Sequence, residues 1–318
     1  MRQVVHGTTK RTPWAQWGPA RLASYLAAIV ATVVLATIAT RLLVPPAPSP
    51  WHQLVWIKNA LLPLALFAIY AGLVRLLEHR PAHEIGIRQA FPEFLVGALL
   101  GTSLMGGLLL TLWWLGFGYV TAGTGLYGLG GGLLVPLVTA MGEELLFRAV
   151  LFRMIEEMAG TTVAILVSAA IFGLSHAGNP GATPFVVAEL SVELGVVVAL
   201  AYVLTRNIWL AIGIHMTWNF TQGYLFGVSV SGVRDPQSLL QMTLSGPDLI
   251  TGGAFGPEGS ILMLGLSLVA SGVLFILAKR SGHWIPPGLR LRSAQPSLFS
   301  DDAAGVDRAS SVFGTADR

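Results

Sequence analysis

The stretch GGLLVPLVTAMGEELLFRAVLF, residues 131–152, has the composition of a membrane-spanning helix that carries two adjacent carboxylates and an arginine. Apolar residues flank Glu143, Glu144 and Arg148 on both sides. Charged groups at membrane depth are costly in free energy, so they are rare unless they are paired or functional. The rest of the chain must therefore supply the helices that surround these three charges.

The overall composition is that of a membrane protein. Of the 318 residues, 53% are hydrophobic and 11% are charged, and the mean hydropathy is +0.68. A soluble domain is about 25% charged. This deficit of charge, together with long apolar runs, predicts an all-α fold: a polytopic bundle of helices in a lipid bilayer.

Eight segments are apolar enough to be considered as spans, given that a helix needs roughly 20 residues to cross the hydrocarbon. Proline- and glycine-rich breaks separate several of them. The expected spans are residues 23–44, 56–75, 94–116, 130–152, 162–177, 184–204, 208–226 and 260–278.

The basic residues predict the orientation of the bundle. If the amino terminus is cytoplasmic, the loops that hold Arg234, and Arg41 and Lys58 near span ends, are the outer ones. This bias follows the positive-inside rule and predicts that both termini are cytoplasmic. The lack of an organelle signal favours a prokaryotic plasma membrane. The inner side would hold Arg2, Lys10, Arg11, Arg21, Arg75, Arg80, Arg88, Arg153, Arg206, Lys279, Arg280, Arg290 and Arg292.

Several functions are excluded or disfavoured by composition. The chain has no cysteine, which excludes disulfides, thiolate zinc sites, cysteine nucleophiles and iron–sulfur clusters. The net charge of +3 comes from residues placed as topology signals rather than in a patch, so no nucleic-acid partner is predicted.

Spacing sorts the polar residues inside the expected spans. Glu144 and Arg148 are four residues apart on one helical face, where an ion pair can form. Glu143 is rotated by about 100° from Glu144, so it is expected to face a different neighbour. His215 and Asn219 are again four apart. From these polar residues we expect the fourth, fifth and seventh spans to converge on an internal polar cavity.

Two further polar sites lie in the fifth and sixth spans. His176, near the end of the fifth span, is expected to line the same cavity. Glu189 and Glu193 share a face of the sixth span, and we interpret them as supporting partners or cavity lining. A single buried His or Asn in a membrane helix is more often an interhelical hydrogen-bonding residue than a catalyst. The occurrence of all these groups together is what indicates a catalytic role.

These groups are suited to amide hydrolysis without a covalent nucleophile. Glu143 in an apolar cavity is a stronger base than in water, because desolvation disfavours its charged form. It could take a proton from the attacking water molecule while His176 holds that water in line. His and Asn side chains can donate hydrogen bonds to an oxyanion. A divalent metal such as zinc, held by His176, His215 and Glu143, is the alternative, although no H-E-x-x-H motif is present.

Three motifs follow one another in the order of a known family. The set resembles the signature of the CAAX protease and bacteriocin-processing (CPBP) family, also called the type II CAAX prenyl endopeptidase or Abi family. The resemblance covers about residues 83–226. The motifs are E-E-x-x-x-R at Glu143, Glu144 and Arg148, F-x-x-x-H at Phe172 and His176, and H-x-x-x-N at His215 and Asn219.

The resemblance implies an intramembrane endopeptidase that acts on hydrophobic or lipidated peptides. It implies the role of general base for Glu143, support of the site for Glu144 and Arg148, water positioning for His176, and oxyanion stabilisation or metal binding for His215 and Asn219. The chain then divides into an amino-terminal segment with two spans (1–82), a catalytic core (83–226), an outer loop with the last span (227–282) and a disordered cytoplasmic tail (283–318).

Two other functions fit the same sequence. A non-catalytic membrane scaffold or immunity protein would use the fold to bind peptides without needing Glu143. A transporter coupled to protons or cations would depend on Glu189 and Glu193 as much as on Glu143.

Overall fold

The computed structural model describes residues 16–43 and 53–289. The described chain is helical apart from one small sheet. The elements are α1 (Gly18–Leu43), α2 (Gln53–Leu73), η3 (Val74–Glu78), η4 (His83–Ile85), α3 (Ala90–Trp114), β1 (Gly118–Ala122), α4 (Leu129–Glu144), η5 (Leu145–Phe152), α5 (Arg153–Ala159), α6 (Thr161–Ser175), α7 (Pro184–Leu190), η6 (Ser191–Val196), α8 (Val197–Thr205), α9 (Trp209–Asn219), η7 (Phe220–Leu225), β2 (Leu240–Leu244), α10 (Asp248–Thr251), η8 (Pro257–Gly259) and α11 (Ile261–Arg280).

All eight apolar segments predicted from the sequence contain helix. Among the described residues, five helices are long and apolar enough to cross a membrane: Gly18–Leu43, Asn59–Glu78, Ala90–Trp114, Pro184–Thr205 and Ile261–Arg280. The chain is therefore an integral membrane protein. The count of eight spans, the cytoplasmic termini and the division into four regions stay predictions.

The remaining three segments are not among these five, which are chosen by length and composition. The fourth carries Glu143, Glu144 and Arg148 within one apolar window. The fifth, Thr161–Ser175, has 15 residues. The seventh is α9 with its π-helical extension η7, 17 residues from 209 to 225. These are the segments that carry the three motifs.

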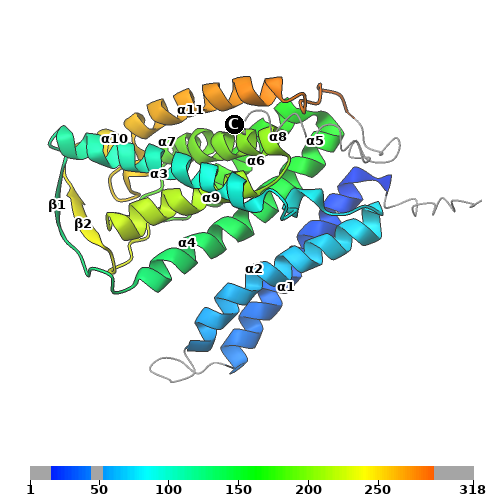
Figure 1. Cartoon of the computed structure of the whole chain (residues 1–318), viewed down its shortest axis with the longest axis horizontal. Helices are drawn as coiled ribbons and strands as arrows, with labels where there is room; N and C mark the ends of the chain where they lie inside the picture. The colour runs from blue at the N-terminus through cyan, green and yellow to red at the C-terminus, as the bar shows by residue number, and fades with distance from the viewer. Residues whose placement is uncertain (1–15, 44–52, 290–318) are drawn as a thin grey trace, which may run out of the picture.

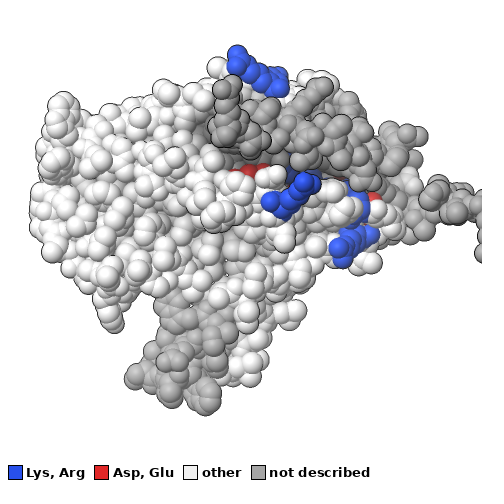
Figure 2. Space-filling view, viewed as in Figure 1, with Lys and Arg blue, Asp and Glu red and all other residues white. Residues whose placement is uncertain are grey.

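The helices form a bundle with an attached hairpin (Figure 1). Helices α1 and α2 lie side by side and run diagonally away from the bundle, which they contact through α4, η5 and α5. Helix α9 lies against α3, and α11 lies along α8. On the face shown in Figure 2, the visible Lys and Arg side chains gather toward the end opposite β1 and β2. The side of the membrane on which these residues lie stays a prediction.

Glycines bring α3 and α9 into backbone contact. A Cβ on Gly101 would lie 2.3 Å from the carbonyl oxygen of Ile214, and one on Gly213 would lie 2.3 Å from that of Phe94. Such small residues let helices approach closely where no hydrophobic effect drives their association. Because Ile214 precedes His215, this contact also sets the position of the third motif.

The loop after α9 is ordered, which the sequence did not predict. Strand β2 pairs with β1 in an antiparallel ladder that runs from Gly118 opposite Leu244 to Ala122 opposite Leu240. The all-α expectation fits the described chain, in which this two-stranded ladder is a minor addition to the helices. The glycine-rich run 125–132 is a connection only at its start, because α4 begins at Leu129 after Gly128 with φ of +88°.

Buried ion pairs, at the end of the bundle away from β1 and β2, attach the hairpin of α1 and α2 to the other helices. The carboxylate of Glu78 accepts two hydrogen bonds from Arg153, both 2.9 Å, and one from Arg80 at 2.9 Å. From α1, the Tyr25 hydroxyl donates to Glu78 at 2.5 Å and Arg21 lies 3.7 Å away. All five side chains are buried, so their charges must be neutralised within the protein.

The carboxyl-terminal segment also packs on this end. The Ile285 amide donates to the Thr161 hydroxyl at 2.8 Å, and the Thr161 amide donates to the Ile285 carbonyl at 3.0 Å. The expected disordered tail, 283–318, is thus ordered at its beginning, while residues 290–318 lie outside the described residues.

We predict that Gly101→Ala destabilises the protein, because its methyl group would force α3 and α9 apart. The matched control is Gly107→Ala in the same helix, where an added Cβ has nothing within 4 Å. The measurement is Tm in detergent for both variants. Equal Tm values for the two alanines would contradict the close packing of α3 on α9.

We predict that Glu78→Ala lowers the free energy of unfolding by about 3–5 kcal/mol, the usual cost of leaving buried charges without their partner. Glu157→Ala is the control, because Glu157 pairs with Arg21 but its side chain is 29% exposed. This variant should lose about 1 kcal/mol or less. Equilibrium unfolding of the purified protein compares the two.

Candidate active site

Three helical segments bring the predicted residues together. Glu143 and Glu144 end α4, and η5 continues the same helix with Arg148. His176 follows the last residue of α6, and His215 and Asn219 lie on α9. The expected meeting of the fourth, fifth and seventh segments thus has a structural basis, although the roles of these residues stay predictions.

His215 lies between the two carboxylates. Its Nδ1 is 2.8 Å from Oε1 of Glu144, and its Nε2 is 3.9 Å from Oε2 of Glu143. The expectation that the two glutamates face different neighbours was therefore wrong: they face opposite edges of one imidazole ring. A ring with nitrogen atoms on both edges can meet two side chains that the helix separates by about 100°.

Burial differs sharply between the two glutamates. The side chain of Glu144 is fully buried, while that of Glu143 is 30% exposed. Glu144 is therefore held within the protein, while Glu143 is partly exposed, although its Oε2, the oxygen that faces His215, is itself buried. Asn219, one helical turn beyond His215, is half-buried, and in the described part of the chain its side chain has no hydrogen-bond partner.

Arg148 neutralises Glu144 and reaches the next helix. Its Nε lies 3.1 Å from Oε2 of Glu144, which confirms the predicted ion pair. Its Nη2 donates to the carbonyl oxygens of Leu194 at 3.5 Å and Gly195 at 3.2 Å. Those two carbonyl groups were missed by sequence reasoning, because backbone acceptors leave no residue-type signal.

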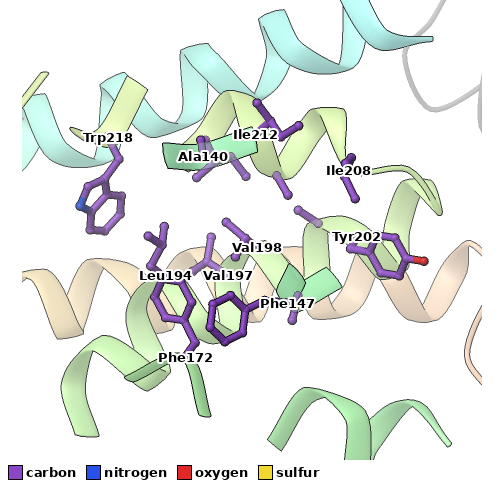
Figure 3. Packing of buried hydrophobic residues seen from close by; sticks show 14 of the residues in the cluster. Ala140, Phe147, Phe172, Leu194, Val197, Val198, Tyr202, Ile208, Ile212 and Trp218 are labelled. Carbon is purple, nitrogen blue, oxygen red and sulfur yellow. The ribbon is translucent and has the colours of Figure 1, made fainter. Parts of the chain in front are cut away.

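Phe172 occupies the centre of the site. Its ring centroid is 4.9 Å from that of His176 and 6.1 Å from that of His215. The guanidinium of Arg148 lies 5.0 Å from the same ring, within the range of a cation–π contact. Figure 3 shows the ring beside Phe147 and below Leu194. The phenylalanine of the second motif therefore separates the two histidines and packs on the arginine of the first.

His176 makes its described hydrogen bonds within its own turn. Its Nδ1 lies 2.9 Å from the Phe172 carbonyl oxygen and 3.1 Å from the Ser175 hydroxyl. Because a carbonyl oxygen only accepts, Nδ1 carries the proton. Nε2 is then the nitrogen with a lone pair available for a new partner.

The predicted metal set is not a preformed cluster. No group of three or more His, Asp or Glu side chains among the described residues is arranged to hold a metal ion. His215 Nδ1 is bonded to Glu144, and Nδ1 of His176 to a carbonyl, which leaves Nε2 of each histidine as the nitrogen that could bind an ion. A metal held by His176, His215 and Glu143 stays a prediction.

A second group of carboxylates lies near the site. Glu189 and Glu193 are 2% and 0% exposed, and neither carboxylate has a hydrogen-bond partner within the described residues. They are buried, as expected for supporting or lining groups. They do not contact Arg148 or the histidines by any hydrogen bond or ion pair that the described residues form.

Comparison with known proteins agrees with the motifs. Residues 125–221 match the family model described as "Type II CAAX prenyl endopeptidase Rce1-like". No curated protein and no solved structure matches the chain. The match confirms the resemblance predicted from the motifs, which all lie inside the matched residues, and implies protease chemistry for this part of the chain.

We predict that Arg148→Lys lowers the free energy of unfolding by about 1.5–3 kcal/mol per lost bond to a charged group. A lysine keeps the charge, but its ammonium group lacks the planar set of N–H donors with which the guanidinium bonds Glu144 and the two carbonyl oxygens. Arg75→Lys, on an exposed arginine, is the control and should leave Tm unchanged. An unchanged Tm for Arg148→Lys would contradict the bridging role.

Proposed function

We propose that the protein is an intramembrane endopeptidase in which Glu143 activates a water molecule. The observation that carries the proposal is the arrangement of His215 between a fully buried carboxylate and a partly exposed one. Glu144 fixes the ring through Nδ1, and Nε2 faces Glu143 at 3.9 Å. That separation is too long for a direct hydrogen bond and suits one water molecule that contacts both groups.

The reaction follows from these positions. Glu143 takes a proton from the water, and the hydroxide attacks the carbonyl carbon of the scissile peptide bond. The proton then passes from Glu143 to the leaving amine as the carbon–nitrogen bond breaks. A partly exposed base beside buried groups is suited to this work, because it meets substrate in a medium with little water.

His215 and Asn219 are the proposed donors to the oxyanion. With Nδ1 bonded to Glu144, a protonated His215 presents Nε2–H to the site. Its positive charge, with that of Arg148, balances the charges of Glu143 and Glu144, so the cluster is neutral overall. The free side-chain amide of Asn219 adds a second donor. His176, with its Nε2 lone pair, is the proposed acceptor that orients the water.

The proposed substrate is a hydrophobic or lipidated peptide, reached from the bilayer of a prokaryotic plasma membrane. An apolar groove of about 500 Å³ lies between α6 and α7, beside the turn that carries His176. Its walls include Ala170, Leu174, Ala177, Val187, Ala188 and Ser191. Such a surface suits an apolar chain and offers few partners to a charged one.

A transporter coupled to protons or cations is the second candidate. It is favoured by Glu189 and Glu193, which are buried carboxylates without hydrogen-bond partners in the described residues. Ionisable groups of this kind inside a membrane mark proton or ion pathways in many transporters. The two candidates differ in which glutamate is essential.

We predict that Glu143→Gln lowers kcat for cleavage of hydrophobic and lipidated reporter peptides by about 10²–10⁴-fold, the usual contribution of a general base. Glu189→Gln, which changes an equally isosteric carboxylate outside the site, should stay within a factor of about three. Cleavage should persist with a chelator, because the proposed steps use no metal.

The controls decide between the candidates. Equal cleavage by wild type and Glu143→Gln would overturn the assignment of the base. Loss of cleavage on chelation would overturn the metal-free route. If no form cleaves any reporter, and Glu189→Gln abolishes ion-coupled uptake into proteoliposomes, the transporter replaces the protease. Binding of peptides without cleavage or uptake would instead support the scaffold or immunity protein.

A further inference from the structure

The outer loop, residues 227–259, is tied to the site through one buried carboxylate. Glu258, in η8, is 2% exposed. Its Oε1 accepts hydrogen bonds from the Ser231 amide at 2.6 Å and the Ser231 hydroxyl at 2.8 Å. Its Oε2 accepts from Nε1 of Trp218 at 3.3 Å. Glu258 therefore links two parts of the outer loop to helix α9.

Trp218 brings this link directly to the third motif. It precedes Asn219 and follows His215 by three residues on α9. Its ring is fully buried and lies on the far side of Leu194 from Tyr202 in Figure 3. The hydrogen bond that its indole N–H donates to Glu258 therefore restrains the rotation of α9 and, with it, the direction in which Asn219 points.

The same loop packs closely against the turn that carries His176. A Cβ on Gly232 would lie 2.0 Å from the Pro180 carbonyl oxygen, and one on Gly181 would lie 2.6 Å from the Phe255 amide nitrogen. The Gly232 amide also donates to the Phe255 carbonyl at 2.7 Å. Because Ser231 precedes Gly232, the bonds to Glu258 hold the loop at this contact.

Charge near Glu258 supports the connection. Burial raises the pKa of Glu258, and the hydrogen bonds from Ser231 and Trp218 act in the opposite direction. The carboxylate also lies within electrostatic range of His176, the histidine of the second motif. Glu193, in η6, also lies within electrostatic range of Glu258.

We infer that Glu258 is a positioning residue, which holds His176 and Asn219 in register by fastening the outer loop to both. The inference rests on the proposed function for its effect on catalysis. Both oxygens of Glu258 accept hydrogen bonds, so the role needs a carboxylate. A glutamine can keep the Ser231 bonds only by turning its NH2 toward the indole N–H, where two donors would meet.

The main test is Glu258→Gln in the full-length protein. We expect kcat to fall about tenfold with KM within twofold, because a hydrogen bond to a charged group is lost while the substrate groove is untouched. Ser238→Ala is the control in the same loop, since Ser238 is buried but its hydroxyl has no partner within the described residues. It should leave kcat unchanged.

A double-mutant cycle with Trp218→Phe tests the contact itself. Phenylalanine removes the indole donor that glutamine would face. The fold-loss of kcat in the double variant should therefore be at least threefold smaller than the product of the two single fold-losses. Additive losses would overturn the link between Glu258 and α9. If Glu258→Gln fails to fold, Ser231→Ala, which removes one donor, should lower kcat by a few-fold with unchanged KM.

A distance measurement tests, independently of catalytic activity, whether Glu258 fastens the loop. The chain has no cysteine, so spin labels can be placed on exposed Asp235→Cys in the loop and Arg280→Cys at the end of α11. Glu258→Gln should broaden the distance distribution and Ser238→Ala should not. A wild type that cleaves nothing overturns the proposed function and the catalytic part of the inference. Unchanged kcat or distances in Glu258→Gln overturn the positioning role.

Discussion

The site depends on Glu144, a fully buried carboxylate that is shared by two cationic or proton-donating partners. Its Oε2 is paired with Arg148 and its Oε1 with His215. A buried charge of either sign would be very costly alone, so none of these three groups can be placed without the others. The relative positions of α4, η5 and α9 follow from this single requirement.

One continuous helix connects this site to the ion pairs at the other end of the bundle. α4, η5 and α5 run without a break from Leu129 to Ala159. The helix carries Glu143 at the site and Arg153, which is bonded to Glu78. The amino-terminal hairpin, which supplies Tyr25 to the same cluster, is therefore attached to the helix that holds the proposed base. One charge cluster meets this helix at its middle, at Glu144, and the other meets it nearer its carboxyl end, at Arg153, and apolar side chains pack around both (Figure 3).

Much of this arrangement could be predicted from sequence because it is local. Apolar run length indicated the helices, and a spacing of four residues indicated the pair of Glu144 with Arg148. Contacts between distant segments were less accessible. Both glutamates meet one ring of His215, 71 and 72 positions later, and β1 pairs with β2 across more than 100 residues. Such contacts depend on how helices pack, which periodicity does not encode.

The order of the loop 227–259 was the largest omission, for the same reason. Its sequence is rich in Gly, Ser and Pro and has no periodicity, which is typical of a simple connection. Its glycines instead allow backbone contacts, as where Gly232 meets Pro180. Glu258 lies in this loop outside every motif, and only its burial and its three hydrogen bonds distinguish it from a solvated acid.

The pairing of Glu144 with Arg148 inside one helix also bears on how the chain enters the bilayer. Synthesis proceeds from the amino end, so the helix that contains these charges is made before Leu194, Gly195 and His215 exist. A translocating segment with an unpaired arginine and an unpaired glutamate would be held back at the water interface. Because the two neutralise each other four residues apart, the segment can leave the insertion machinery with Glu143 as its one unpaired carboxylate, and it acquires its distant partners as they are synthesised.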